Sequence, residues 1–191
     1  ILRLHRDGKT IVGICGGYQI LGKTIKDPHG TESAIDEING LGLLNTETVF
    51  EEIKTTTQVE GDVSFVNNGV LQGMDTKKVM GYEIHMGQTK LLDGTSPLIK
   101  ITKRLEEDVE VFDGGINKEG NVFGTYIHGV FDNISFTREM LNKVRELKGL
   151  GKIESSISSF DEFKEREYQK LAKIVRENVD MDKIYQIVAG E

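Results

Sequence analysis

The chain has 191 residues, 37% of them hydrophobic and 29% charged, which fits one globular domain with a core of its own. A formal net charge of −7, with no Lys/Arg cluster, excludes the basic face with which proteins hold nucleic acid or an anionic membrane. The single cysteine excludes an internal disulfide, and no signal peptide or apolar membrane span is visible, so the sequence favours a cytoplasmic protein.

The first six residues, ILRLHR, are typical of the last turns of a helix, and Gly8 fits the stop that follows them. They include no initiator methionine. We therefore expect that the chain begins inside a domain and that the first strands of its sheet lie upstream of Ile1.

The only cysteine lies in residues 10–22, TIVGICGGYQILG. The apolar run before Cys15 predicts a buried strand, and the residues after it predict a helix, so Cys15 falls on the turn between them. This arrangement is typical of a nucleophile elbow of the G-x-S-x-G kind. Such a turn strains the nucleophile and crowds the positions two before and two after it, so we expect Gly13 and Gly17 to be needed there.

At the start of a helix, the Cys15 thiol would face unpaired N–H groups that favour the thiolate. Two other interpretations remain open on local grounds. A lone cysteine is often a small buried hydrophobic residue, and a Gly-rich turn can hold phosphate. The spacing of the glycines fits neither G-x-G-x-x-G nor a Walker loop.

Residues 27–33, DPHGTES, predict a loop, and the β-branched residues of 46–66 predict strands. Asn67-Asn68-Gly69 is a turn signal. Residues 78–89 predict a strand that places Glu83 and His85 on one face. This acid and imidazole could form a site, although a solvated strand face explains them as well.

Further strands are expected over 98–102 and 109–112, and an apolar strand over 121–132 carries His128 at its end. Open α/β sheets place their chemistry at the carboxyl ends of strands. The alternative is a core histidine that binds backbone.

From Ser135 the pattern is helical, with an apolar repeat that Gly149 closes. A capping box that begins at Ser159 predicts a helix to about Asn178, and Asp180 can cap a last short helix. Both C-terminal helices carry apolar stripes that are expected to pack inward: Phe163, Leu171, Ile174 and Val175, then Met181, Ile184, Ile187 and Val188.

Cys15 and His128 each end a predicted buried strand, although they lie far apart in the sequence. An imidazole near the thiol could take its proton and later return it to a leaving group. The four histidines and the cysteine show none of the usual zinc spacings, so no metal site is expected.

Four ordered motifs carry a resemblance to a known family: residues 13–22 (GICGGYQILG), 27–33, 81–87 (GYEIHMG) and 124–132 (GTYIHGVFD). Together they resemble the C-terminal glutamine amidotransferase domain of the cobyric acid synthase family, from about Lys9 to the end. The resemblance implies an α/β, class I glutamine amidotransferase-like (flavodoxin-like) fold, an open sheet flanked by helices with added β-hairpin strands. It also implies one amidotransferase domain over residues 1–191.

Carried over to this sequence, the resemblance makes Cys15 the nucleophile that attacks glutamine and His128 the acid and base. The N–H of Gly16 would hold the oxyanion, with a second donor upstream of Ile1, and Gln19 would lie next to bound glutamine. The wider class places a Glu two residues after its histidine, where this chain has Val130. We therefore hypothesise that Glu83 or a partner domain orients His128.

The family's complete enzyme passes ammonia to an ATP-dependent synthetase domain of the same polypeptide, which amidates adenosylcobyrinic acid a,c-diamide in cobalamin biosynthesis. That domain is not in this sequence, so ATP, Mg²⁺ and the corrinoid are implied partners, and no cofactor is expected in the domain itself. Two alternatives stay open: the amidotransferase domain of a related synthase (cobyrinate a,c-diamide or cell-wall amidating), or a non-catalytic docking domain with the same fold.

Overall fold

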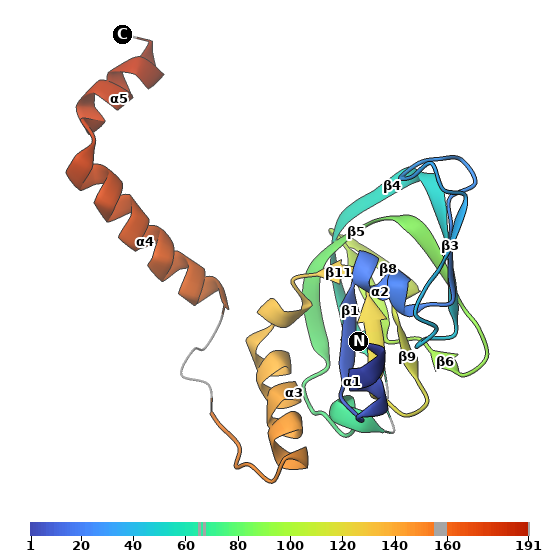
Figure 1. Cartoon of the computed structure of the whole chain (residues 1–191). Coiled ribbons are helices and arrows are strands. Elements are labelled where there is room, and N and C mark those ends of the chain that lie inside the picture. The colour runs from blue at the N-terminus through green and yellow to red at the C-terminus, as the bar shows by residue number, and fades with distance from the viewer. Residues whose placement is uncertain (65, 67, 155–159, 191) are drawn as a thin grey trace. The chain divides into compact units, whose positions relative to one another are not determined.

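The computed structural model describes residues 1–64, 66, 68–154 and 160–190, and its internal contacts divide the chain into two units, Ile1–Glu154 and Ser155–Glu191. The first unit holds the sheets (Figure 1). Its elements are α1 (Leu2–Arg6), β1 (Ile11–Ile14), α2 (Gly16–Leu21), β2 (Thr24–Lys26), β3 (Glu37–Asn39), β4 (Thr46–Val63), the 3-10 turn η1 (Gly69–Leu71), β5 (Lys78–Leu91), β6 (Thr95–Ser96), β7 (Ile99–Arg104), β8 (Glu107–Asp113), β9 (Gly115–Asn117), β10 (Val122–Thr125), β11 (Ile127–His128), η2 (Val130–Asp132) and α3 (Ile134–Leu147).

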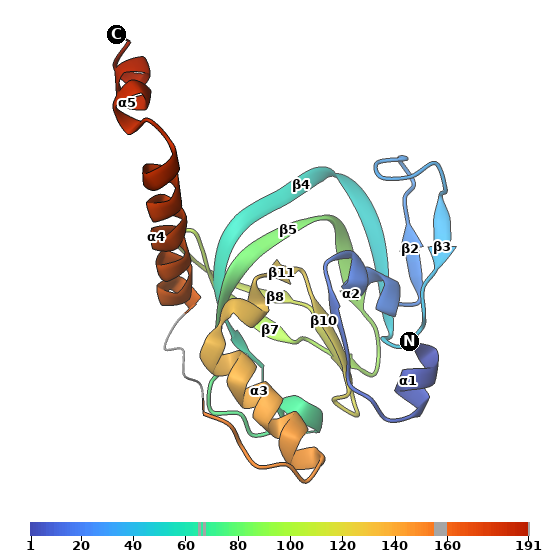
Figure 2. The same ribbon diagram turned by 60° about the vertical axis from the view of Figure 1, so that its left-hand side comes forward.

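The strands form two sheets. One has the order β1-β10-β9-β6, and the other has the order β11-β5-β4-β2-β3, with β7 and β8 added beside β4. Figure 2 shows β4 and β5 side by side as two long, strongly curved strands. Only the β1·β10 and β2·β4 ladders are parallel among the described strands. The α/β class and the β-hairpin additions predicted from the sequence are confirmed.

The prediction of one continuous strand over 121–132 is wrong, because the strand is interrupted at Tyr126. The part before the break, β10, pairs with β1, whereas β11 pairs with β5 of the other sheet. The cause is Asp113, a buried carboxylate that accepts hydrogen bonds from the Thr125 hydroxyl and the Tyr126 N–H. That N–H is therefore satisfied outside any ladder, and the chain can pass from one sheet to the other.

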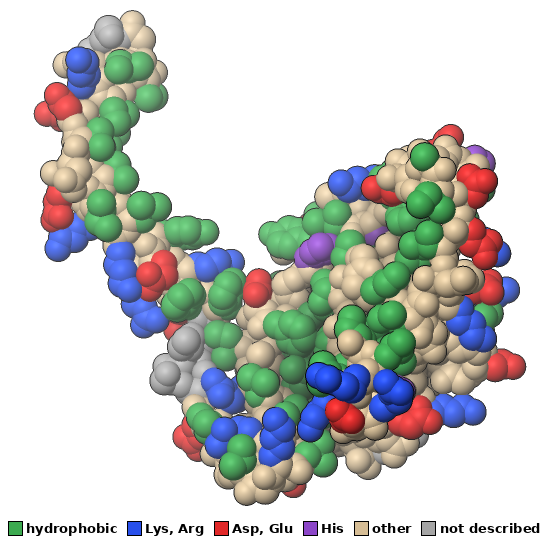
Figure 3. Space-filling model, in the orientation of Figure 1, with side chains coloured by type: hydrophobic (Ala, Val, Ile, Leu, Met, Phe, Trp, Pro, Cys, Tyr) green, Lys and Arg blue, Asp and Glu red, His purple; other side chains and the backbone are tan. Residues whose placement is uncertain are grey.

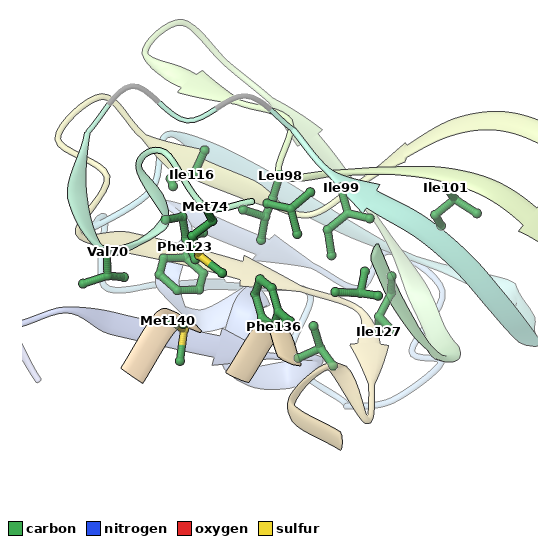
Figure 4. Packing of buried hydrophobic residues seen from close by; sticks show 14 of the residues in the cluster. Val70, Met74, Leu98, Ile99, Ile101, Ile116, Phe123, Ile127, Phe136 and Met140 are labelled. Atoms are coloured by element: carbon green, nitrogen blue, oxygen red, sulfur yellow. The ribbon is translucent and has the colours of Figure 1, made fainter. Parts of the chain in front are cut away.

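The main core lies between the sheets, α3 and η1 (Figure 4). Phe136 and Met140 of α3 are 3% and 8% exposed and pack into the same cluster as Phe123 and Ile127. Burying each of these side chains contributes about 1.5–3 kcal/mol, which anchors α3. The predicted apolar repeat of this helix and its end before Gly149, whose φ is +67°, are confirmed.

The second unit consists of α4 (Phe160–Asn178) and α5 (Met181–Ala189). The side chain of Asp180 accepts a hydrogen bond from the Lys183 N–H, as predicted for the cap of the last helix. Ser159, the predicted start of the capping box, lies outside the described residues. No helix in the described part of the chain is long and apolar enough to cross a membrane.

The expectation that the apolar stripes of these two helices pack inward is wrong, because several of their side chains are exposed. Leu171, Ile174 and Val188 are 59%, 57% and 81% exposed. Two successive helices offer each other too little surface to cover such stripes, and green apolar side chains run along both helices in Figure 3.

Candidate active site

Cys15 lies on a strained turn between β1 and α2, as the sequence predicts. Its φ of 53° and ψ of −117° lie in a region that non-glycine residues rarely adopt. The Cys15 N–H donates to the Thr125 carbonyl over 2.9 Å, and the Cys15 carbonyl accepts from Tyr18 and Gln19. These bonds hold the strained residue between the last residue of β10 and the first turn of α2.

The two glycines of the elbow differ. A Cβ at Gly13 would lie 2.5 Å from the Gly17 carbonyl oxygen and 2.7 Å from the Leu21 side chain, so the predicted crowding at Gly13 is confirmed. A Cβ at Gly17 would have no described atom within 4 Å beyond its chain neighbours and the backbone of its own helix. The expectation for Gly17 is therefore wrong, because this position faces open space.

Gly16 is the first residue of α2, so its N–H has no acceptor within the helix. It immediately follows the Cys15 thiol in the chain. This N–H is therefore free to serve as the predicted oxyanion donor.

The Cys15 thiol and His128 both lie beside β5. The Cys15 thiol donates to the Ile84 carbonyl over 3.4 Å. His128 pairs with Tyr82 across the β11·β5 ladder. This pairing lies two residues along β5 from Ile84, the residue whose carbonyl binds the Cys15 thiol.

The Nε2 atom of His128 is buried and has no hydrogen-bond partner among the residues that the structure describes. An unsatisfied buried polar atom costs about 1–3 kcal/mol, and a ligand or water that bonds to this nitrogen would recover that free energy. This nitrogen is the group that an acid–base role for His128 requires.

Glu83 does not reach His128. It pairs with Ile127 across the ladder, so its side chain lies on the face opposite to His128. Both carboxylate oxygens bind Arg104 over 3.0 Å, and one also binds Nε2 of His85 over 3.0 Å. The hypothesis that Glu83 orients His128 therefore has no contact to support it, and the histidine that Glu83 orients is His85.

In the cluster of Glu83, His85 and Arg104, the pKa values of Glu83 and His85 shift toward their charged forms. Burial alone would raise the pKa of Glu83, but hydrogen bonds from His85 and Arg104 outweigh it and hold this pKa below its ordinary value. Burial alone would lower the pKa of His85, but the bonds to Glu83 and the Gly87 carbonyl raise it above its ordinary value. A protonated His85 donates through both ring nitrogens, which matches its two acceptors.

Gln19 points inward rather than to solvent. It is 7% exposed, and its Nε2 donates to the Tyr126 hydroxyl over 3.2 Å. Its contact with bound glutamine stays a prediction. Within the described ranges, no three His, Cys, Asp or Glu side chains gather as a metal-binding group.

The CobB/CobQ-like glutamine amidotransferase domain family matches residues 1–136, which include the elbow, β5 and His128. This chain belongs to that family. The predicted enzyme class, a glutamine amidotransferase, is thereby confirmed, and Cys15 and His128 stand within the matched range.

Two curated relatives of this amidotransferase domain extend well beyond it. Cobyric acid synthase of Thermoanaerobacter sp. (strain X514) is 53% identical over 98% of this chain and 37% of its own length. Cobyric acid synthase of Alkaliphilus metalliredigens (strain QYMF) is 48% identical over 100% of this chain and 38% of its own length. The chain thus spans less than two fifths of these relatives.

The solved structure of PurLQS from Thermotoga maritima shares the fold. Its TM-score is 0.52 at 19% identity, over 75% of this chain and 66% of that one. This agrees with the class I amidotransferase-like fold that the sequence predicts.

Two residues of this amidotransferase domain have no distinct signal in the sequence. Arg104 binds Glu83 from a distant strand, and nothing in the local pattern marks it. Tyr126 follows the apolar pattern of its strand two positions before His128. Its hydroxyl binds Gln19, which lies 107 positions away in the sequence.

Proposed function

We propose that this chain is the glutaminase unit of a cobyric acid synthase, hydrolysing glutamine at Cys15 and supplying the ammonia for an ATP-dependent amidation. The observation that carries the proposal is the strained Cys15, whose thiol binds β5 two residues from the partner of His128, together with the buried His128 Nε2, which has no hydrogen-bond partner among the described residues. The relatives that match at 53% and 48% identity along nearly the whole chain bear the name cobyric acid synthase, which supports this choice over a related synthase.

The reaction begins when His128 takes the thiol proton and Cys15 Sγ attacks the side-chain carbonyl carbon of glutamine. The Gly16 N–H stabilises the oxyanion of the tetrahedral intermediate, a contribution of about 3–4 kcal/mol at comparable sites. His128 then gives its proton to the leaving nitrogen, and the C–N bond breaks to release ammonia. A γ-glutamyl thioester remains on Cys15.

Hydrolysis of the thioester completes the cycle. His128 accepts a proton from water as the water oxygen attacks the thioester carbon, and the C–S bond breaks to release glutamate. The proton returns to Sγ. These steps use side chains of this chain, glutamine and water, and we assign ATP, Mg²⁺ and adenosylcobyrinic acid a,c-diamide to the synthetase part of the longer relatives.

Covalent trapping tests the glutaminase step. The chain is incubated with a diazoketone analogue of glutamine, and adducts are located by peptide mass spectrometry. We expect one adduct on Cys15, slowed by excess glutamine and absent in Cys15→Ser. An unmodified Cys15 would overturn the proposal and leave the non-catalytic docking domain.

A chimera tests the assignment to cobyric acid synthase. This chain replaces the matching region of the Thermoanaerobacter cobyric acid synthase, to which it is 53% identical. We expect amidation of adenosylcobyrinic acid a,c-diamide with glutamine as the nitrogen donor. The Cys15→Ser chimera should use only added ammonium, and a Cys15→Ser chimera that still uses glutamine would contradict the assignment.

A further inference from the structure

A chain of buried and partly buried hydrogen bonds runs from α2, the helix that follows Cys15, to the curved strands β4 and β5. Gln19 Nε2 donates to the Tyr126 hydroxyl, which bonds the Thr89 hydroxyl over 2.6 Å. Thr89 in turn bonds the Thr48 hydroxyl over 2.7 Å. The Tyr126 oxygen accepts a hydrogen bond from Gln19, so the Tyr126 O–H can donate to Thr89. The Thr89 O–H can then donate to Thr48, so every hydroxyl along this path has a partner.

The ring of Tyr126 is held on two sides. His85 stacks on it with ring centroids 4.2 Å apart and planes 26° apart, and Tyr18 meets it edge-on at 5.3 Å. His85 is itself fixed by its bonds to Glu83 and to the Gly87 carbonyl. These contacts restrict rotation of the Tyr126 side chain and therefore fix the position of its hydroxyl.

Two glycines show how closely the Gln19 amide is seated. A Cβ at Gly87 would lie 2.7 Å from Gln19 Nε2 and 3.3 Å from the Tyr126 hydroxyl, so the amide packs directly against the backbone of β5. The other end of the amide, Oε1, lies 4.0 Å from the place of a Cβ on Gly16. The nitrogen end is thus anchored at Tyr126, and the oxygen end faces the first turn of α2 beside Cys15.

From these contacts we infer that Tyr126 is a positioning residue, which fixes the Gln19 amide beside the elbow so that it can recognise glutamine. The inference rests on the proposed function and on the expectation that Gln19 lies next to bound glutamine. Its physical basis is preorganisation: a polar group held in place before binding loses less conformational freedom when the ligand arrives. Without the Tyr126 hydroxyl, the amide could turn, and its buried N–H would have no acceptor.

The test compares two reagents on the only cysteine of the chain. In Tyr126→Phe, the half-saturating concentration of the diazoketone glutamine analogue should rise about tenfold, the size expected from losing one buried hydrogen bond. The rate of alkylation by iodoacetamide, which needs no glutamine recognition, should stay the same. A general distortion of the elbow would change both.

Tyr18→Phe is the matched control, because it removes a hydroxyl from the neighbouring buried ring that does not bond Gln19. It should leave the half-saturating concentration of the analogue unchanged. If Tyr126→Phe fails to fold, Thr89→Val removes the next hydroxyl along and should give a smaller rise in the same direction.

The decisive variant combines two changes. If Tyr126 acts through Gln19, then Tyr126→Phe should add no further effect in a Gln19→Ala background. An equal half-saturating concentration in wild type and Tyr126→Phe, or full additivity in the double variant, would overturn the inference alone. An unlabelled wild-type Cys15 would overturn the proposed function, and this inference with it.

Discussion

Single glycines set how closely β5 and β11 approach each other. At Gly81 on β5, a Cβ would lie 2.1 Å from the His128 carbonyl oxygen and 2.6 Å from the Ile127 side chain. Both obstacles belong to β11, and one of them is backbone, which cannot rotate away. The position of His128 therefore depends on the absence of a side chain at Gly81.

Gly81→Ala should push β11 away from β5 and carry His128 with it. We expect labelling of Cys15 by the diazoketone analogue to slow at least tenfold, and the free energy of unfolding to fall by about 1–3 kcal/mol, as in other overpacked sites. Urea unfolding and labelling kinetics measure the two effects. Gly151→Ala is the matched control, because a Cβ there meets nothing within 4 Å. Equal behaviour of the two variants would contradict the argument.

Asp113 gives the fold a pH dependence of its own. Burial raises its pKa from the ordinary 3.8 to about 6, against the hydrogen bonds from Thr125 and Tyr126 that favour the charged form. The folded protein therefore binds more protons than the unfolded chain between these two pH values. The contribution of Asp113 to stability is largest below pH 4 and is lost as the pH rises to about 6.

Asp113→Asn removes this titration and keeps the size of the side chain. Relative to wild type, the free energy of unfolding of Asp113→Asn should increase by up to about 3 kcal/mol between pH 4 and pH 7. Urea titrations of both proteins at a series of pH values measure it. A constant difference across this range would show that Asp113 has an ordinary pKa.

At the scale of elements, the sequence predicts the features that depend on residues close in the chain. It does not predict the features that depend on residues far apart in the chain. The strand–turn–helix around Cys15, the long strand that carries Glu83, and the last helices follow from local periodicity and glycine placement. The break at Tyr126 depends on Asp113, and the partner of Glu83 is Arg104, so neither has a local signature. The sequence makes Glu83 a candidate partner of His128 for the same reason. Alternation along a strand predicts which residues share a face, but it does not predict which distant side chains lie against that face.

The side chain of Asn133 extends the pairing between β11 and β5. Beyond His128 the β11·β5 ladder ends, and the Asn133 amide takes over: Oδ1 accepts the Met80 N–H over 3.0 Å, and Nδ2 donates to the Met80 carbonyl over 2.9 Å. Nδ2 also lies 3.2 Å and 2.9 Å from the carbonyls of Gly129 and Val130. One side chain thus ties β5 to the turn that follows His128.

Asn133→Ala should lower the free energy of unfolding by about 1–3 kcal/mol and slow analogue labelling of Cys15, because β11 loses its anchor. Urea unfolding and labelling kinetics again report the two effects. Asn142 offers a matched control: its amide makes the same reciprocal pair of bonds, with the exposed Ile153 backbone. Asn142→Ala should leave labelling unchanged, and a similar loss in both variants would contradict a specific role for Asn133.

At the scale of the whole molecule, the two units differ in how far their apolar side chains are buried. Every member of the two buried clusters lies within the first unit, whereas α5 buries none of its residues. The family match also ends at residue 136, inside α3. The hydrophobic free energy that supports the site therefore comes from residues before 155.

A chain that ends at Glu154 should fold with the site intact. We expect it to keep the cooperative urea transition of wild type, with a free energy of unfolding within about 1 kcal/mol, because deletion removes no core residue. Labelling of Cys15 by the diazoketone analogue should also keep its half-saturating concentration. Circular dichroism, urea unfolding and labelling kinetics test these points. Loss of the cooperative transition would show that residues 155–191 supply stability that the buried clusters do not reveal, and an intact transition with lost labelling would assign these residues a part in the site.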